Sequence, residues 1–277
     1  MVRMNRPPNT LLAPLNSRQL NRLASISAVL LLAMLLLFVF DANRPLFIAI
    51  NHVSEYTGTA LWANLTSLGE GLVVLSLTGA VAMRWPAAAW AVLIAAVVGT
   101  LLVHGLKEAF NLPRPALVLP AGSFNIIGPR LMVVSFPSGH SATIAAFATI
   151  IFIHSRHTWS RVGLIALVLL VGLSRIAVGA HWPMDVLAGW LVGLLIAVVS
   201  YVLAERWTVG LKVPTQSSII VLSLFCAVAL IWLQSYMAEA QLLRWLIATI
   251  GLATGIWALI SLHRPRAIDP AGDDPTG

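Results

Sequence analysis

The sequence predicts an all-α, polytopic transmembrane helical bundle, and two observations support this fold class. Of the 277 residues, 59% are apolar and only 10% are charged, which gives a mean hydropathy of +0.90. Eight apolar runs follow one another along the chain. Because the bilayer core has no water to satisfy backbone N–H and C=O groups, such runs are expected to cross it as helices. The composition excludes an ordinary soluble domain of this length.

The apolar runs give the elements in order. The first covers 24–40, and no Ala-x-Ala cleavage site follows it, so we interpret it as a span and not as a signal peptide. Residues 45–66 mix apolar and polar side chains, which favours an interfacial helix. Several runs are shorter than the ~20 residues that a span needs, so flanking residues are expected to lengthen those helices. The other spans are expected at 68–83, 86–106, 140–154, 162–174, 184–204, 217–235 and 242–262.

The distribution of basic residues predicts the orientation of these spans. With the N-terminus in the cytoplasm, eleven Lys and Arg residues lie inside and six lie outside, as the positive-inside rule requires. In this orientation four spans have one end at the outer face. Two of them end there, at Lys107 and Arg175, and two begin there, at His140 and just after His181. The net charge is +7, and the basic residues are scattered along the chain, which favours contact with anionic lipid and not with nucleic acid.

The segment Pro137-Ser138-Gly139-His140 opens one of these helices. A helix N-terminus presents free N–H groups and the positive end of the helix dipole, which together favour an anion. Ser138 can cap the helix or donate to an oxyanion, and Gly139 lets the backbone approach a ligand closely. An ordinary capped helix start is the simpler interpretation of this segment alone, but His140 adds a titratable group beside the expected anion site.

The segment Ser174-Arg175-x5-His181-x3-Asp185 joins two spans. Asp185 falls in the first turn of the second span, where its carboxylate can reach back to His181. Such a carboxylate fixes the imidazole tautomer and raises the basicity of the opposite ring nitrogen, as a nucleophilic histidine requires. A purely structural His–Asp pair is the alternative for this segment on its own.

The segment Lys107-x6-Arg114-Pro115 supplies two more cations, which bind phosphate oxygens or anchor to lipid headgroups. A cation inside the membrane costs roughly 2.5–3.5 kcal/mol, so three cations that converge on one surface need an anion. A transferring phosphoryl group is such an anion, and cations stabilise it without a metal. Asp185 is the only acidic residue among the fixed positions of the three segments, so neither a metal site nor a cofactor is expected.

Together the three segments resemble the signature of the type 2 phosphatidic acid phosphatase superfamily, the lipid phosphate phosphatases, which also resemble vanadium haloperoxidases. All eleven fixed positions of the signature are present, within residues 68–204. The resemblance implies that His181 attacks phosphorus, that Asp185 orients His181, and that His140 protonates the leaving oxygen and then activates water. It also implies that the phosphoryl oxygens are held by Lys107, Arg114, Ser138, Gly139 and Arg175.

The resemblance also implies a six-span phosphatase core at 24–204, with a cytoplasmic disordered tail at 1–23, two added helices at 205–263 and a disordered tail at 264–277. The expected substrates are anionic phospholipids or polyprenyl phosphates, met at the outer face of a bacterial inner membrane. A lipid phosphotransferase and a non-catalytic lipid or anion transporter remain alternatives, and the oligomeric state is open. Outside the signature, Glu70, His104 and Arg130 are interpreted as ordinary interface or helix-end residues.

Overall fold

The computed structural model describes residues 14–264, and all regular secondary structure in that range is helical, so the predicted fold class is confirmed. The helices are α1 (Ser17–Val39), α2 (Asn43–Thr57), α3 (Thr59–Ser67), α4 (Gly71–Ser76), α5 (Thr78–Arg84), α6 (Pro86–Phe110), α7 (Pro115–Val118), α8 (Gly139–His154), α9 (Thr158–Ala177), α10 (Pro183–Arg206), α11 (Val213–Trp232) and α12 (Gln241–His263), with 3-10 turns η1 (Thr208–Leu211) and η2 (Ala238–Ala240).

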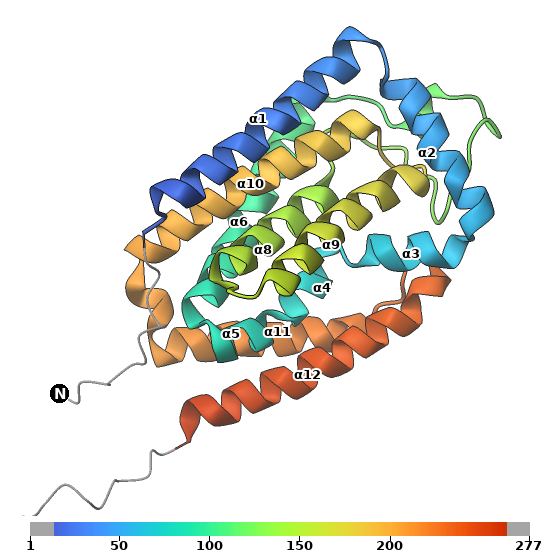
Figure 1. Ribbon diagram of the computed structural model, residues 1–277. Helices are drawn as coiled ribbons and strands as arrows, with labels where there is room; N and C mark the ends of the chain where they lie inside the picture. Colours follow the sequence, from blue (N-terminus) through green and yellow to red (C-terminus); the bar gives the residue numbers. More distant parts are fainter. Residues whose placement is uncertain (1–13, 265–277) are drawn as a thin grey trace, which may run out of the picture.

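The helices form one bundle with α6, α8, α9 and α10 near its centre (Figure 1). Helix α1 packs along the outside of α10, and none of its residues is buried. Helices α11 and α12 lie side by side and pack against α4 and α5. Helix α2 lies across one end of the bundle (Figure 1). The two added helices therefore form a C-terminal hairpin beside the predicted core.

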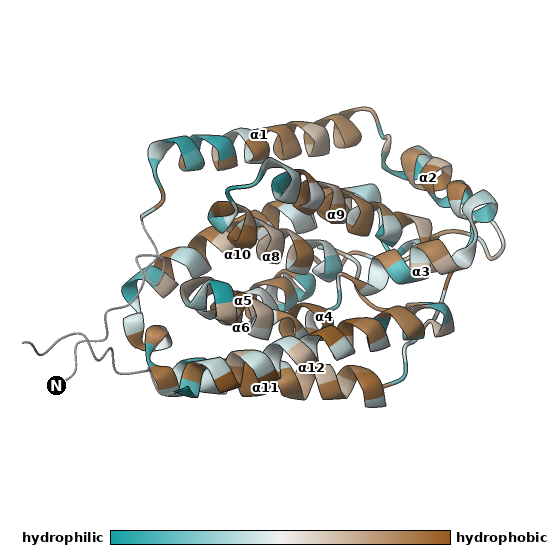
Figure 2. Cartoon of the chain, turned by 60° about the horizontal axis from the view of Figure 1, so that its bottom comes forward, coloured by the Kyte–Doolittle hydropathy of each residue, from teal (hydrophilic) through white to brown (hydrophobic). Residues whose placement is uncertain are grey.

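Six helical segments in the described range are long and apolar enough to cross a membrane. The segment 59–67 and the segment 71–84 pass the same test together, although the chain bends by 58° between them. Helix α8 is apolar but has only 16 residues. Hydrophobic residues predominate along the long helices, and α1 is hydrophilic at its N-terminal end (Figure 2). The eight predicted spans thus correspond to six full spans, one bent span and one short helix.

Two predicted boundaries were wrong. Helix α1 begins at Ser17 and not at residue 24, because the side chain of Asn16 accepts a hydrogen bond from the N–H of Gln19 and forms a capping box. Residues 17–23, which were predicted to belong to the disordered N-terminal tail, are therefore part of α1. The rest of both predicted tails lies largely outside the described range, at 1–13 and 265–277. The interfacial segment 45–66 divides into α2 and α3 at Gly58, whose positive φ of 82° suits glycine.

Helices α8 and α10 approach each other closely because glycines face small residues. A Cβ atom on Gly189 would lie 2.6 Å from the carbonyl oxygen of Ser138, and one on Gly193 would lie 2.6 Å from that of Ala142. Spacing of small residues by four along a helix allows such backbone contact in membranes. The contact brings the start of α8 against the start of α10, where the N–H of Ser138 donates to the carbonyl of Asp185 at 2.9 Å.

Candidate active site

The structure brings the three sequence segments together at one end of the bundle. Lys107 lies in the last turn of α6, Ser138 caps α8, Arg175 lies in the last turn of α9 and Asp185 lies in the first turn of α10. The end of an α-helix leaves backbone groups without intrahelical partners, so converging ends create a polar site inside an apolar protein.

His181 and Asp185 form the centre of this site, and each residue is 2% exposed. The Nδ1 atom of His181 lies 3.3 Å from Oδ2 of Asp185. The same carboxylate oxygen accepts hydrogen bonds from Oγ of Ser135 at 2.5 Å and from the backbone N–H of Trp182 at 2.8 Å. Three groups therefore hold Asp185 in one orientation, and Asp185 in turn holds the imidazole.

Arg114 contacts the opposite side of the imidazole. Its Nη1 atom donates to the carbonyl of Ala180 at 2.8 Å and lies 3.3 Å from Nε2 of His181. Its Nε atom donates to the carbonyl of Val133 at 3.0 Å. Because a guanidinium only donates, Nε2 is the ring nitrogen that carries the lone pair, and Nδ1 carries the proton that faces Asp185.

Lys107 and Arg175 extend the positive surface around this nitrogen. The Nζ atom of Lys107 donates to the carbonyls of Val134 and Ser135, each at 3.3 Å. Arg175 is 4% exposed, and its Nη1 atom donates to Oγ1 of Thr66 in α3. The Nε atom of Arg175 is buried and has no hydrogen-bond partner. An unpaired buried donor of this kind is costly, so it is available to an incoming oxygen.

The start of α8 supplies the remaining predicted groups. Ser138 is fully buried, and its Oγ atom accepts from Oγ of Ser141 at 2.9 Å. A Cβ atom on Gly139 would meet only Val103, at 3.7 Å, so the backbone is not crowded on that side. His140 follows in the first turn of α8 and lines a cavity together with Arg175. Free N–H groups at this helix start face the same positive region.

Burial lowers the pKa of His181 well below its usual value of 6.5, and the cations Arg175, Arg114 and Lys107 and the neighbouring His140 lower it further. The imidazole therefore stays neutral at physiological pH, and Nε2 keeps its lone pair. A neutral imidazole beside three cations has the chemistry that attack on a bound anion requires. Within residues 14–264, no group of three or more His, Cys, Asp or Glu side chains is placed to hold a metal ion.

Comparison with known proteins identifies this arrangement. Residues 88–209 match the family described as the PAP2 superfamily. The chain is 30% identical over 166 residues to an undecaprenyl-diphosphatase of Sulfolobus acidocaldarius, which covers 57% of this chain and 76% of that protein. The chain belongs to the PAP2 superfamily.

Two further relatives agree with this assignment. A lipid A 1-phosphatase of Rhizobium etli is 40% identical over 92 residues, which cover 32% of this chain and 38% of that protein. The crystal structure of Aquifex aeolicus LpxE superposes with a TM-score of 0.53 and 31% identity, over 57% of this chain and 93% of that chain. The protein is thus a PAP2 phosphatase with a multi-pass membrane domain, and α11 and α12 lie beyond the residues that match the family.

Sequence reasoning missed several residues of this PAP2 site. Ser135 bonds to Asp185 and its Oγ lies 3.4 Å from Nδ1 of His181, while Thr66 binds Arg175. Asn51 of α2 is fully buried and donates to the carbonyls of Asn125, Ile176 and Ala177, which ties the interfacial helix to the end of α9. The polar residues of 45–66 were the available signal, because buried polar groups need partners.

The three residues set aside by the sequence analysis have different surroundings. His104 is exposed, and its Nδ1 lies 2.8 Å from the carbonyl oxygen of Thr100 in its own helix. Arg130 is exposed and donates to the carbonyl of Ala116 at 2.9 Å. Glu70, in contrast, lines the cavity that His140 and Arg175 share.

Proposed function

We propose that this PAP2 phosphatase hydrolyses a lipid phosphate or diphosphate through a phosphohistidine intermediate on His181, without a metal ion. One observation carries the proposal: Asp185 and Ser135 contact Nδ1 of His181, while Nε2 faces the guanidinium of Arg114 at 3.3 Å. A nucleophilic nitrogen is thus oriented toward the groups that would hold a phosphoryl oxygen.

The reaction has two displacements. In the first, Nε2 of His181 forms a bond to phosphorus as the P–O bond to the lipid breaks, and His140 gives a proton to the leaving oxygen. In the second, water attacks phosphorus, His140 accepts the water's proton, and the P–N bond breaks to release phosphate. Lys107, Arg114 and Arg175, with the N–H groups at the start of α8, stabilise the charge on the phosphoryl oxygens. A diphosphate substrate would release the lipid monophosphate in the first step.

An apolar cavity of about 220 Å³ beside the site supports a lipid substrate. Its lining comes from α4, α6, α8 and α10 and includes Val74, Val92, Phe147 and Ile196. Gly139 belongs to the same lining, so the cavity reaches the start of α8. A hydrocarbon chain placed there would leave its phosphate near the helix end, where the cations lie.

We infer that the site faces the non-cytoplasmic side of a bacterial inner membrane, as the distribution of basic residues favours. Undecaprenyl diphosphate and lipid A 1-phosphate are the first substrates to test, because the relatives are named for them. Phosphatidylglycerol phosphate and phosphatidic acid complete the panel as glycerolipids that end in a phosphate monoester.

The test measures phosphate release by the purified full-length protein from each lipid, with EDTA present. Release from at least one lipid by the native protein, and none by His181→Ala of unchanged elution volume in gel filtration, is the expected result. Substantial turnover by His181→Ala, or activity that requires an added divalent metal, would contradict the proposed mechanism. Transfer of phosphate to another lipid, with no inorganic phosphate, would identify a phosphotransferase instead.

A further inference from the structure

An ion pair outside the PAP2 signature, between a buried arginine and a partly exposed glutamate, links the C-terminal hairpin to the site. The Nη2 atom of Arg244 in α12 lies 3.7 Å from Oε2 of Glu70, which precedes α4. Arg244 is 3% exposed, and its Nε atom is buried without a hydrogen-bond partner. Arg244 also lies near the N-terminus of its helix, where the helix dipole disfavours a cation. The Glu70 carboxylate is therefore the group that compensates this buried charge.

Glu70 also faces the catalytic groups. It lines a cavity of about 190 Å³ together with His140 and Arg175. Its neighbour Gly69 packs directly on the histidine, since a Cβ atom there would lie 2.9 Å from Cβ of His140. The carboxylate of Glu70 interacts electrostatically with Arg175 as well as with Arg244. Glu70 therefore stands between an arginine of the site and an arginine of the hairpin.

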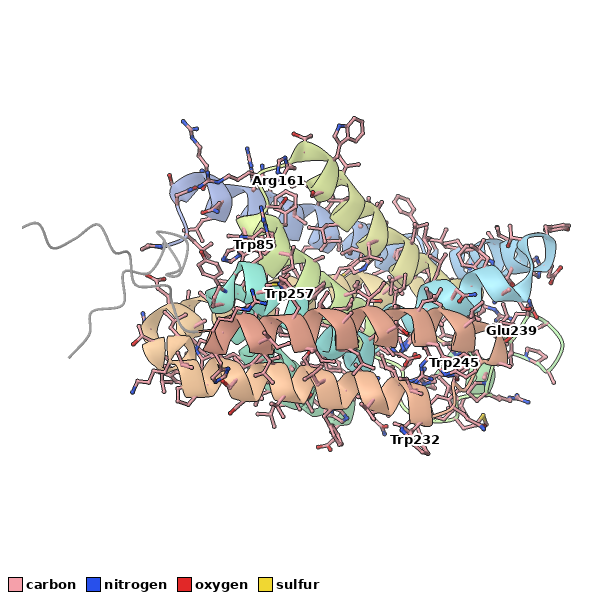
Figure 3. All side chains as sticks on the ribbon, turned by 90° about the horizontal axis from the view of Figure 1, so that it is seen from below. Trp85, Arg161, Trp232, Glu239, Trp245 and Trp257 are labelled. Carbon is pink, nitrogen blue, oxygen red and sulfur yellow. The ribbon has the colours of Figure 1, made fainter. Side chains whose placement is uncertain are left out.

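The hairpin forms part of the wall of this cavity. Ser235, Tyr236 and Met237, in the connection between α11 and α12, contribute to its lining. The connection is fixed to α3, because Glu239 accepts from Oγ1 of Thr59 at 3.3 Å and its carbonyl accepts from Nδ2 of Asn64 at 3.2 Å. Figure 3 shows Glu239 at the end of the molecule where α12 begins and α3 lies. The connection of the hairpin therefore lines the cavity and is held to α3.

His140 needs an anion near it for the reaction proposed above. It must carry a proton when the leaving oxygen departs, yet its burial opposes a positive charge, and the cations Arg175, Arg114 and Lys107 oppose it further. His181 faces the same region and is neutral in its attacking form. Glu70 is the acidic residue that shares the cavity with His140. Its ion pair with Arg244 partly neutralises the negative charge of the Glu70 carboxylate.

We propose that Glu70 is a positioning residue that favours the protonated form of His140 through its charge, and that Arg244 of the C-terminal hairpin limits this effect. The inference rests on the proposed function, because it assigns a partner to the proton donor of that mechanism. The two added helices then have a role in catalysis: they adjust the pH range in which the proton donor works.

The test compares the pH dependence of kcat for the native protein, Glu70→Gln and Arg244→Gln on one soluble short-chain lipid phosphate. Loss of the carboxylate makes protonated His140 less stable, so the basic limb of Glu70→Gln moves to lower pH by roughly 0.5–1 unit. Loss of Arg244 leaves the carboxylate uncompensated, so the basic limb of Arg244→Gln moves to higher pH. In the double variant, the upward shift caused by Arg244→Gln should disappear.

A matched control is Glu239→Gln, which removes the same charge from an exposed position at the same end of the molecule. It should keep the native pH profile. Arg244→Lys keeps the charge and should also keep the native profile, which gives a result even if Arg244→Gln fails to fold. Shifts of the two variants in the same direction, or an unshifted Glu70→Gln, would overturn the inference. Absence of turnover by the native protein on every lipid phosphate would instead contradict the proposed function.

Discussion

Two carboxylates at this site, one buried and one partly exposed, differ in how they are held, and the difference indicates two roles. Asp185 receives hydrogen bonds from Ser135 and from the backbone of Trp182 and contacts His181, and it is 2% exposed. Glu70 has an ion pair of 3.7 Å with Arg244, and its side chain is 25% exposed. A carboxylate fixed by three short contacts can orient a ring, whereas one held at longer range acts through its charge.

The largest effect in this comparison is expected from Asp185→Asn. An amide can present either its oxygen or its NH₂ group to Nδ1, so the imidazole loses its preferred tautomer and Nε2 no longer keeps its lone pair. A loss of kcat on the order of 10³–10⁴-fold is expected, as for other histidines oriented by a carboxylate. Steady-state phosphate release measures it, and a loss below about tenfold would show that Asp185 does not orient His181.

A smaller effect is expected from Ser135→Ala. The variant removes one of the three groups that hold Asp185, a hydrogen bond to a charged group worth about 1.5–3 kcal/mol, so kcat should fall roughly 10–100-fold. Ser218→Ala is a matched control in α11, because the exposed hydroxyl of Ser218 donates to the carbonyl of Pro214 in its own helix and is far from the site in sequence. Equal loss in the two variants would argue against a role for Ser135 in the site.

The positive surroundings of His181 can be tested by pH. Burial and nearby cations lower the pKa of His181 well below 6.5, so protonation of Nε2 should not limit kcat between pH 7 and pH 6. Lys107→Met removes one cation, which raises the pKa of His181 toward its usual value and moves the acidic limb of kcat to higher pH. An acidic limb that stays in place, measured at saturating substrate, would mean that Lys107 does not act on this imidazole.

The apolar cavity offers a change that should depend on the substrate. Gly99 lines this cavity in α6, and a Cβ atom there would lie 3.4 Å from Ile196. Gly99→Leu fills the cavity and should raise KM several-fold for a long-chain lipid phosphate, while p-nitrophenyl phosphate is hydrolysed as before. Gly105→Leu lies in the same helix, has no atom within 4 Å of a built Cβ, and serves as the control. An equal effect on both substrates would show that the cavity does not bind the hydrocarbon chain of the substrate.

The sequence predicted the helical runs and the charged residues of the signature because both depend on local patterns. Apolar runs report burial directly, and cations in an apolar chain are conspicuous. Ser135 and Thr66 could not be found in this way, since a loop serine and a helix threonine have no distinctive local pattern. Thr66 contacts Arg175 across 109 residues, and only the packing of α3 against α9 makes the pair.

The joint between α4 and α5 illustrates the same limit. The hydroxyl of Ser223 in α11 donates to the carbonyl of Ser76 at 2.8 Å and accepts from the N–H of Gly79 at 2.9 Å. The C-terminal hairpin therefore satisfies backbone groups at a break in a span that precedes it by more than 140 residues. A run of apolar residues at 68–83 gives no sign of this break. Ser223, which forms hydrogen bonds with the backbone groups at the break, lies far along the chain.

The proposal depends on the nucleophilic role of His181, and rapid chemical quenching during turnover tests it most directly. The native protein is mixed with a lipid phosphate labelled on the transferred phosphorus, stopped with alkali within milliseconds, and digested for mass spectrometry. The account predicts phosphate on the peptide that contains His181, stable in alkali and lost in acid. Turnover with no protein-bound label, or label that survives acid on a serine, would contradict it.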